Sequence, residues 1–353
     1  MAEPTTERSA QRFRDLPAPH LRDGLGTRGI MFAVVVALLP AALGSFYFFG
    51  PRALALVAVA SASAVVAEAA CQAVARRRVA ATDGSALVAG MLLAFTLPPG
   101  VPYWMAVVGA VFAVVVVKAL FGGLGYNLLN PALAARAFLM AFWPAQMSAA
   151  WIAPARGTLS GISGVDAIAT ATPLGALKMA RGVLSDPSAS LQEVASAAKN
   201  LEYLYSSGSL KNLAFGNVGG CLGETSALLL AVGGVYLIAR RIVSWTVPVS
   251  FIATVGLVTW MLGGEGVFQG NPLFHILSGG LLLGAFFMAT DTVTSPITWK
   301  GRLIFGFGCG ALTSIIRLMG VFPEGVCYSI LLMNLTVPVL DRLTRPRILG
   351  DLR

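Results

Sequence analysis

The sequence has few charged residues, few histidines and few cysteines, and each shortage excludes a class of protein. Only 12% of the 353 residues are charged and 56% are hydrophobic, whereas a soluble domain carries about one quarter charged residues. The four cysteines form no C-x-x-C pair. With two histidines, they indicate neither a disulfide framework nor a zinc or iron–sulfur site within the chain. The composition therefore predicts an integral membrane protein.

The net charge of +9 does not indicate nucleic-acid binding, because the basic residues do not gather in one patch. They stand at the ends of apolar runs, which is the pattern that sets membrane topology. We therefore expect membrane lipid, and no nucleic acid, around this chain.

Ten apolar runs predict an all-α integral membrane protein with about ten transmembrane helices. The run at 85–97 is shorter than the roughly twenty residues that cross a bilayer, and Pro98, Pro99 and Gly100 close it. This pattern predicts a tilted, buried span or a half-helix beside an internal site. The predicted spans are about 29–49, 53–75, 85–97, 102–120, 131–150, 219–239, 245–262, 273–290, 302–320 and 325–340.

The positions of Lys and Arg predict the orientation of these spans. Most of the basic residues fall on one face of a ten-span arrangement, and this face is expected to be cytoplasmic. Both termini then lie in the cytoplasm. A cleaved signal peptide is not expected, because the first 28 residues contain no apolar core and the first apolar run is long enough to remain as a span. The expected organisation is a tail at 1–28, a five-helix repeat at 29–150, an extracytoplasmic loop at 151–218, a second five-helix repeat at 219–341 and a tail at 342–353.

A weak internal repeat supports the division into two halves. The segment 90–99 resembles 284–296 in ending an apolar run at a turn, and 122–138 likewise resembles 320–341. Halves of five spans each must have opposite orientations. The pattern predicts an inverted repeat, which places a site near the midplane.

The most informative motif lies in the polar loop, where residues 166–174 read DAIATATPL. The hydroxyl of Thr172 can be esterified, and Pro173 suits the first position of a helix. A helix start offers free N–H groups and a positive dipole end, so it would favour a phosphate on Thr172. Alternatively, Thr172 only caps a helix that runs to about Arg181. The two interpretations are compatible.

Several ionisable residues lie in or beside the apolar runs, where a charge at the bilayer centre costs at least about 2.5 kcal/mol. Lys118, Glu224 and Asp291 stand at span ends, so their charges equally suit the headgroup region. Arg136 follows Asn127 and Asn130 at one break between spans. These donors suit either the polar edge of a flavin or a structural network between broken helices. The full set is Glu68, Lys118, Arg136, Glu224, Asp291 and Arg317.

Five sequence blocks together resemble one family across essentially the whole chain. The family contains the D subunit of the Rnf complex, an ion-translocating ferredoxin:NAD oxidoreductase, and more distantly the B subunit of the sodium-pumping NADH:quinone reductase. The blocks are GGLGYNLLNPALAARAF (122–138), DAIATATPL (166–174), GNVGGCLGETSALL (216–229), FFMATDTVTSP (286–296) and GVFPEGVCYSILLMN (320–334).

The resemblance implies FMN attached through a phosphoester to Thr172 by a separate flavin transferase. The family has Ser or Thr at the fourth motif position, where this chain has Ala169, and Thr170 is a rival acceptor. The resemblance also implies a fold similar to urea and ammonium transporters, and a non-covalent riboflavin. The candidate cofactor-binding residues are Thr172, Asp166, Thr170, Ala171, Asn127, Asn130, Arg136 and Asp291.

The expected function is that of an electron-transfer subunit in the bacterial inner membrane. Its flavin loop would be periplasmic, and electron flow through the complex would be coupled to Na⁺ or H⁺ translocation. The expected partners are Rnf subunits A, B, C, E and G. The alternative is a transporter or channel for small solutes or ions with no redox cofactor, which the fold would permit. A pore has no need of the motif from Asp166 to Thr172, so this motif favours the first interpretation.

Overall fold

The computed structural model describes residues 26–76, 81–152, 154, 172–224, 226–264, 266–320, 322 and 324–345. Every regular element within these ranges is helical. Four helices are long and apolar enough to cross a membrane, and they lie where spans were predicted. The chain is therefore a multi-pass membrane protein, as its composition predicts. These helices are α2 (Thr27–Phe49), α3 (Pro51–Val74), α15 (Trp299–Met319) and α16 (Val326–Leu343).

Shorter apolar helices occupy most of the other predicted spans. The short, buried helix expected after residue 85 is confirmed as α4, in which every residue except Leu87 is buried. A helix buried on all sides needs no polar face. The helices are α4 (Ser85–Phe95), α5 (Tyr103–Val111) continuing as η2 (Phe112–Ala119), α6 (Pro131–Phe142), α11 (Ala227–Ala239) and α12 (Thr246–Leu262).

Two predicted spans are broken into pieces. The run at 131–150 divides at Pro144 into α6 and α7 (Pro144–Ala149), because proline cannot continue the hydrogen-bond ladder of a helix. The run at 273–290 divides into α13 (Pro272–Leu277), α14 (Leu281–Leu283) and η4 (Gly284–Met288). Gly279 lies at this break with φ +68°, a conformation that glycine adopts without strain.

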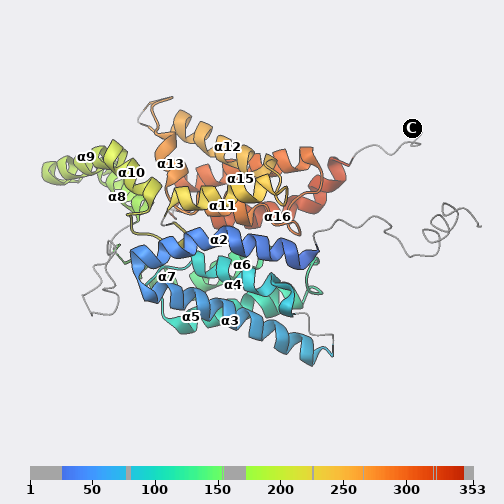
Figure 1. The fold of residues 1–353 in the computed structure, drawn as a ribbon. Coiled ribbons are helices and arrows are strands. Elements are labelled where there is room, and N and C mark those ends of the chain that lie inside the picture. The colour runs from blue at the N-terminus through green and yellow to red at the C-terminus, as the bar shows by residue number, and fades with distance from the viewer. Residues whose placement is uncertain are drawn as a thin grey trace, which may run out of the picture.

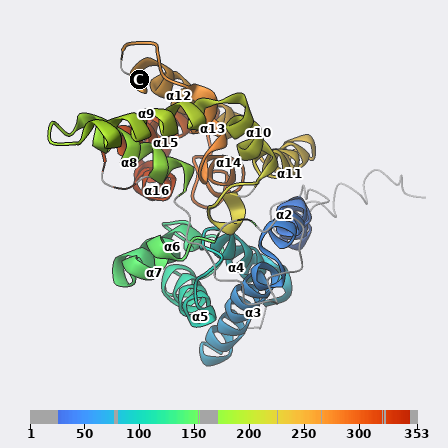
Figure 2. The same ribbon diagram turned by 90° about the vertical axis from the view of Figure 1, so that its left-hand side faces the viewer.

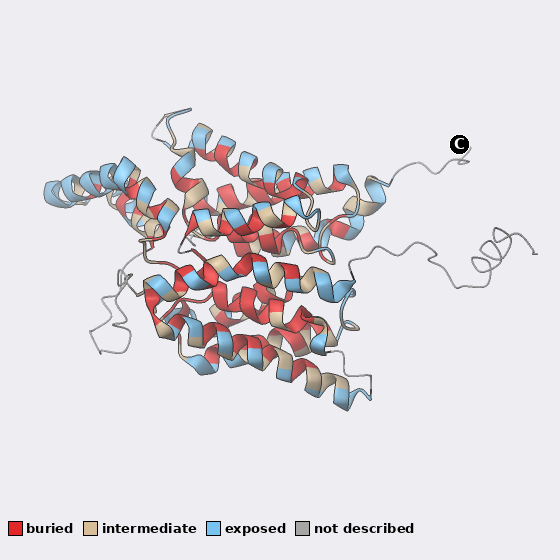
Figure 3. Cartoon of the chain, viewed as in Figure 1, coloured by how far each residue is buried: buried red, intermediate tan, exposed pale blue. Residues whose placement is uncertain are grey.

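The helices form two groups that pack against each other (Figure 1). One group contains α2 to α7 and the other contains α11 to α16, and the separation is clearest in Figure 2. One large hydrophobic core draws residues from both groups. The buried segments of these helices are red in Figure 3. The start of α2 and the end of α16 lie at the same end of the molecule.

Three further helices project at the opposite end of the molecule (Figure 1). They are α8 (Pro173–Ser185), α9 (Leu191–Tyr205) and α10 (Ser207–Phe215). A small core that includes Leu174, Leu177 and Phe274 joins them to α13. The helix expected after Thr172 is confirmed, although it ends at Ser185 and not near Arg181.

Helices α9 and α10 were not predicted from the sequence. A signal for α9 was present, because Ser190 and Glu193 form a capping box. The backbone N–H of Ser190 donates to the Glu193 carboxylate at 2.9 Å, and this bond lowers the pKa of Glu193 below its ordinary value.

Candidate functional site

Thr172 begins helix α8 and is itself buried. Its Oγ1 accepts a hydrogen bond from the backbone N–H of Gly175 at 3.1 Å, and Pro173 occupies the first helical position. The predicted capping role of Thr172 is therefore confirmed. With a relative exposure of only 5%, Thr172 is not on the open surface but in the wall of a cavity. A group attached to its hydroxyl would lie beside the positive end of α8.

The cavity beside Thr172 has a volume of about 440 Å³. This value lies within the roughly 300–1,000 Å³ typical of small-molecule sites. Its walls come mainly from α6, α7, α8 and the start of α16, and they combine large apolar side chains with a few charges. The charged residues are Arg136, Lys178 and Glu324, and the larger apolar and aromatic ones are Met140, Trp151, Met179, Phe322 and Tyr328.

Arg136 is one of the charged residues of this cavity. It lies on α6, whose start is fixed by Asn130: the Asn130 side-chain oxygen accepts from the N–H groups of Ala132 and Leu133. The Arg136 guanidinium forms an ion pair with Glu324 and also donates to Cys221 Sγ at 3.6 Å. The structure thus supplies the acceptors that a buried guanidinium requires.

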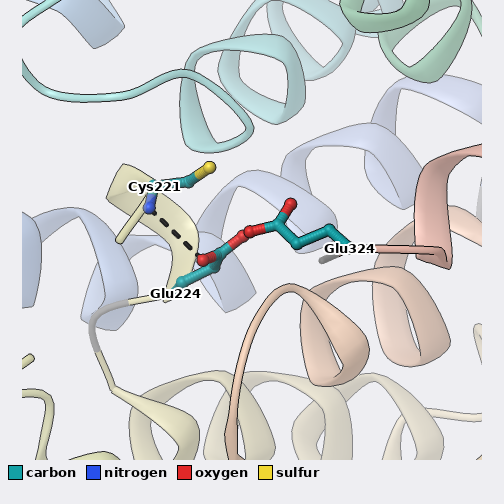
Figure 4. Close-up of side chains that lie close together, drawn as sticks. All are labelled: Cys221, Glu224 and Glu324. Carbon is teal, nitrogen blue, oxygen red and sulfur yellow. Dashed lines mark hydrogen bonds between the residues drawn. The ribbon is translucent and has the colours of Figure 1, made fainter. Parts of the chain in front are cut away.

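Glu324 in turn faces a second carboxyl group, that of Glu224 in η3 (Leu222–Glu224) (Figure 4). Cys221, Glu224 and Glu324 offer ligand atoms that lie within 4.8 Å of one another. That spacing would suit a metal ion, but Arg136 already contacts two of the three residues. A metal cation would have to displace this positive charge, so the cluster is better described as a charge network.

Lys178 completes the charged part of the cavity from the first turns of α8. Its ammonium group donates to the backbone carbonyl of Gly320, at the end of α15. Partial burial lowers the pKa of Lys178 below its ordinary value, because desolvation disfavours the charged form. Lys178 shares the wall of this cavity with Thr172 and supplies it with a basic group.

The structure separates Arg136 from the amides that precede it in the sequence. Asn127, Asn130 and Asp291 line a different cavity, of about 100 Å³, on the other side of the break before α6. Asn130 also donates to the carbonyl of Met288 at 3.3 Å, so it ties α6 to η4. The expected convergence of the two amides with the guanidinium does not occur, because α6 carries Arg136 away from its own N-terminus.

The second cavity retains one polar group without a partner. The side-chain oxygen of Asn127 is buried and meets no donor among the described residues. The Asp291 carboxylate accepts from the N–H of Val293 and the hydroxyl of Thr294, each at 3.3 Å. Ile242, Val243, Thr290 and Thr292 line both this cavity and a neighbouring one of about 530 Å³, which widens the available space.

Lys118 also lines this second cavity but has its own partners. Its ammonium group contacts Glu68 at 2.5 Å and donates to Ser85 at 2.6 Å. Both charged residues are buried, so the Lys118 ammonium group ends on partners within the protein. The pair links η2 to α3 and explains two of the ionisable residues found within apolar runs.

Three of the candidate cofactor-binding residues, Asp166, Thr170 and Ala171, lie outside the described residues. Conversely, Glu324 and Lys178 were not predicted from the sequence as site residues. A signal for Glu324 existed, because this acid stands directly before an apolar span. Lys178 lies on the helix predicted after Thr172, but no local pattern shows that its side chain faces a cavity.

Comparisons with known proteins agree with this picture over nearly the whole chain. A family model described as the NQR2, RnfD, RnfE family matches residues 16–350. The D subunit of a proton-translocating ferredoxin:NAD(+) oxidoreductase complex from Clostridium ljungdahlii is 45% identical, covering 95% of this chain and 96% of the relative. The D subunit of a Na(+)-translocating ferredoxin:NAD(+) oxidoreductase complex from Acetobacterium woodii is 43% identical over 94% of each chain. The D subunit of an ion-translocating oxidoreductase complex from Stutzerimonas stutzeri is 43% identical over 91% of each chain.

Proposed function

The chain belongs to the NQR2, RnfD, RnfE family, and we propose that it is the D subunit of an ion-translocating ferredoxin:NAD oxidoreductase complex. We further propose that it carries FMN on Thr172. It is one subunit of an enzyme complex and not a complete enzyme. The observation that carries the flavin assignment is the position of the Thr172 hydroxyl at the start of α8, in the wall of a cavity large enough for an organic cofactor.

The residues of this cavity fit such a group. Trp151, Phe322 and Tyr328 provide apolar and aromatic surface for a planar ring. Lys178 and the positive end of α8 favour an anionic phosphoester at Thr172. FMN supplies one-electron chemistry when bound, whereas the protein supplies position, electrostatics and exclusion of water.

A non-covalent riboflavin is proposed for the second cavity together with its larger neighbour. The unpartnered Asn127 side-chain oxygen supports this, because buried polar groups normally have partners. Asn127, Asn130 and Asp291 would contact the polar edge of the ligand. Arg136, which lines the Thr172 cavity, is assigned to the covalent flavin.

The proposed topology is ten spans in two inverted five-helix repeats, with cytoplasmic termini in the bacterial inner membrane. Short buried helices in both halves, α4 and the α14–η4 segment, support this arrangement. Helices α8 to α10 would then face the periplasm. The proposed partners are Rnf subunits A, B, C, E and G and a flavin transferase. The coupling ion is Na⁺ or H⁺, since the two relatives named for an ion differ in which one they translocate.

In-gel flavin fluorescence tests the attachment site directly. The complex is co-expressed with its flavin transferase and separated on a denaturing gel under ultraviolet light. We expect a fluorescent band for the wild type and for Thr170→Ala, and none for Thr172→Ala, although all three proteins assemble. Fluorescence that survives Thr172→Ala and disappears in Thr170→Ala would move the attachment site. A wild-type protein without covalent or bound flavin would favour the transporter alternative.

A further inference from the structure

The carboxyl groups of Glu224 and Glu324 point at each other beside the Thr172 cavity (Figure 4). Glu324 lines the cavity, and Glu224 lies behind it with a relative exposure of 7%. Holding a flavin does not require two opposed carboxyl groups. Two ionised carboxylates that face each other in the protein interior repel each other, so the contact between Glu224 and Glu324 needs an explanation.

One oxygen of Glu224 lacks a hydrogen-bond donor. Oε2 accepts from the backbone N–H of Cys221 at 3.4 Å, whereas Oε1 is buried and meets no donor among the described residues. A buried acceptor without a partner costs about 1–3 kcal/mol, and more if it is charged. A single proton between the two carboxyl groups supplies the missing donor and removes the repulsion. The two side chains therefore have the geometry of a pair that holds one proton (Figure 4).

The surrounding charges also permit the pair to lose that proton. Arg136 contacts Glu324 directly. Arg317 and Glu324 both approach the turn at Gly279, where an added Cβ would lie 3.2 Å from Arg317 Nη2 and 4.0 Å from Glu324 Cγ. The two guanidinium groups balance the charge of two carboxylates. The protein interior can therefore hold the pair with the shared proton or without it. The titratable and charged groups around the pair are Arg136 on α6, Lys178 on α8, Cys221, Arg317 on α15 and Cys327 on α16.

We infer that Glu224 and Glu324 form a proton-binding site whose occupancy is linked to the redox charge in the Thr172 cavity. This inference rests on the proposed attachment of FMN. When one electron arrives from a one-electron redox protein, one proton from water bonds to the pair, which changes from two carboxylates to one carboxylate and one carboxylic acid. When the electron leaves, the proton leaves. The negative charge of the electron and the positive charge of the proton then cancel. This cancellation stabilises the reduced state, because charges interact strongly where water is excluded.

Redox-difference infrared spectroscopy of the flavin-loaded complex tests this inference. We expect reduction to produce a carboxylic-acid C=O band that shifts in D₂O. Glu224→Gln should remove the band, and its amide can donate to Glu324 as the protonated acid does, so the variant should fold. Glu68→Gln is the matched control, because Glu68 is as deeply buried, at 5% exposure, but pairs with Lys118. Its spectrum should retain the band.

The pH dependence of the flavin midpoint potential provides a second measurement. One proton per electron gives a slope of about 59 mV for each tenfold change in proton concentration. The wild type should approach this slope in the pH range where the pair titrates, and Glu224→Gln should be shallower. A band and a slope that both remain unchanged in Glu224→Gln and in Glu324→Gln would overturn the inference.

A flavin-independent measurement separates failure of this inference from failure of the proposed function. The Thr172→Ala protein is titrated without any reductant, and a pH-difference infrared spectrum is recorded. We expect the same carboxyl band there, absent from the Thr172→Ala, Glu224→Gln double variant. If the wild-type protein carries no FMN, the link between proton binding and redox charge is refuted, but this infrared test of the proton site can still be carried out. A band that the double variant retains would refute the proton site itself.

Discussion

Arg136 is held by a small set of acceptors that come from distant parts of the chain. The side chains of the Arg136–Glu324 pair are only 11% and 13% exposed. Taking both charges out of water is costly, so the pair adds little net stability relative to an apolar pair of the same volume. Loss of one partner, however, leaves the other charge buried and unpaired.

We therefore predict that Arg136→Leu destabilises the protein by about 3–5 kcal/mol, the usual cost of breaking a buried ion pair. Arg136→Lys should recover only part of this loss, because a single ammonium group cannot reproduce a planar guanidinium that reaches both Glu324 and Cys221. Thermal unfolding of the purified protein measures the effect. The double variant Arg136→Leu, Glu324→Leu is the control and should be more stable than Arg136→Leu. Equal stability of the wild type and Arg136→Leu would show that the pair is unimportant.

The sequence was sufficient to identify Thr172 and Arg136, but not the partner of Arg136. Thr172 carries a local signal, since an N-cap residue before proline can be recognised from neighbouring residues. Arg136 is unusual in any apolar run. Glu324 lies 188 residues away from Arg136, and only the packing of α6 against α16 brings the two together. No local pattern encodes that pairing.

Close contacts between helices depend on small residues in this protein. Gly233 on α11 faces α2 so closely that an added Cβ would lie 2.1 Å from the carbonyl oxygen of Ala37. Backbone cannot move aside as a flexible side chain can. The contact between α2 and α11 joins the two groups of helices, and small residues allow this close approach.

Gly233→Ala should therefore destabilise the protein by about 1–3 kcal/mol, the usual cost of overpacking. Gly182→Ala is the matched control, because Gly182 also lies in a helix, α8, but has nothing within 4 Å of the added Cβ. Its replacement should be neutral or should stabilise α8 by up to about 1 kcal/mol. Thermal unfolding of both variants in detergent measures the difference. Similar effects of the two substitutions would contradict this account of α2–α11 packing.

Helices that are defined by apolar runs were predicted well from the sequence. Helices whose bounds depend on tertiary contacts were predicted poorly. The long helices and α4 follow from apolar runs and from the Pro98 boundary. The division of 273–290 into α13, α14 and η4 was missed, because most of the run is apolar and it was predicted as one span. Ser278, Gly279 and Gly280 stand where the structure breaks it. Helices α9 and α10 were missed because their segment is polar and contains no long apolar run.

The two ends of the molecule differ in a way that bears on orientation. Helix α2 begins and α16 ends at one end, whereas α8, α9 and α10 gather at the other (Figure 1). Lys300 and Arg302 lie at the start of α15, and Arg342 lies near the end of α16. Positive charge at this end is the usual mark of the cytoplasmic side. The Thr172 cavity, which α8 helps to form, would then open towards the outer face.

Cysteine labelling in intact cells tests this orientation. We expect Ser188→Cys, in a background with the four native cysteines replaced, to react with a membrane-impermeant maleimide. Ser188 is exposed between α8 and α9. Thr82→Cys is the matched control: Thr82 is also exposed, between α3 and α4, and should react only after the cells are opened. The prediction follows from the cost of moving basic residues across the membrane. Labelling of Thr82→Cys and not of Ser188→Cys in intact cells would reverse the orientation, and with it the assignment of the flavin to the outer face.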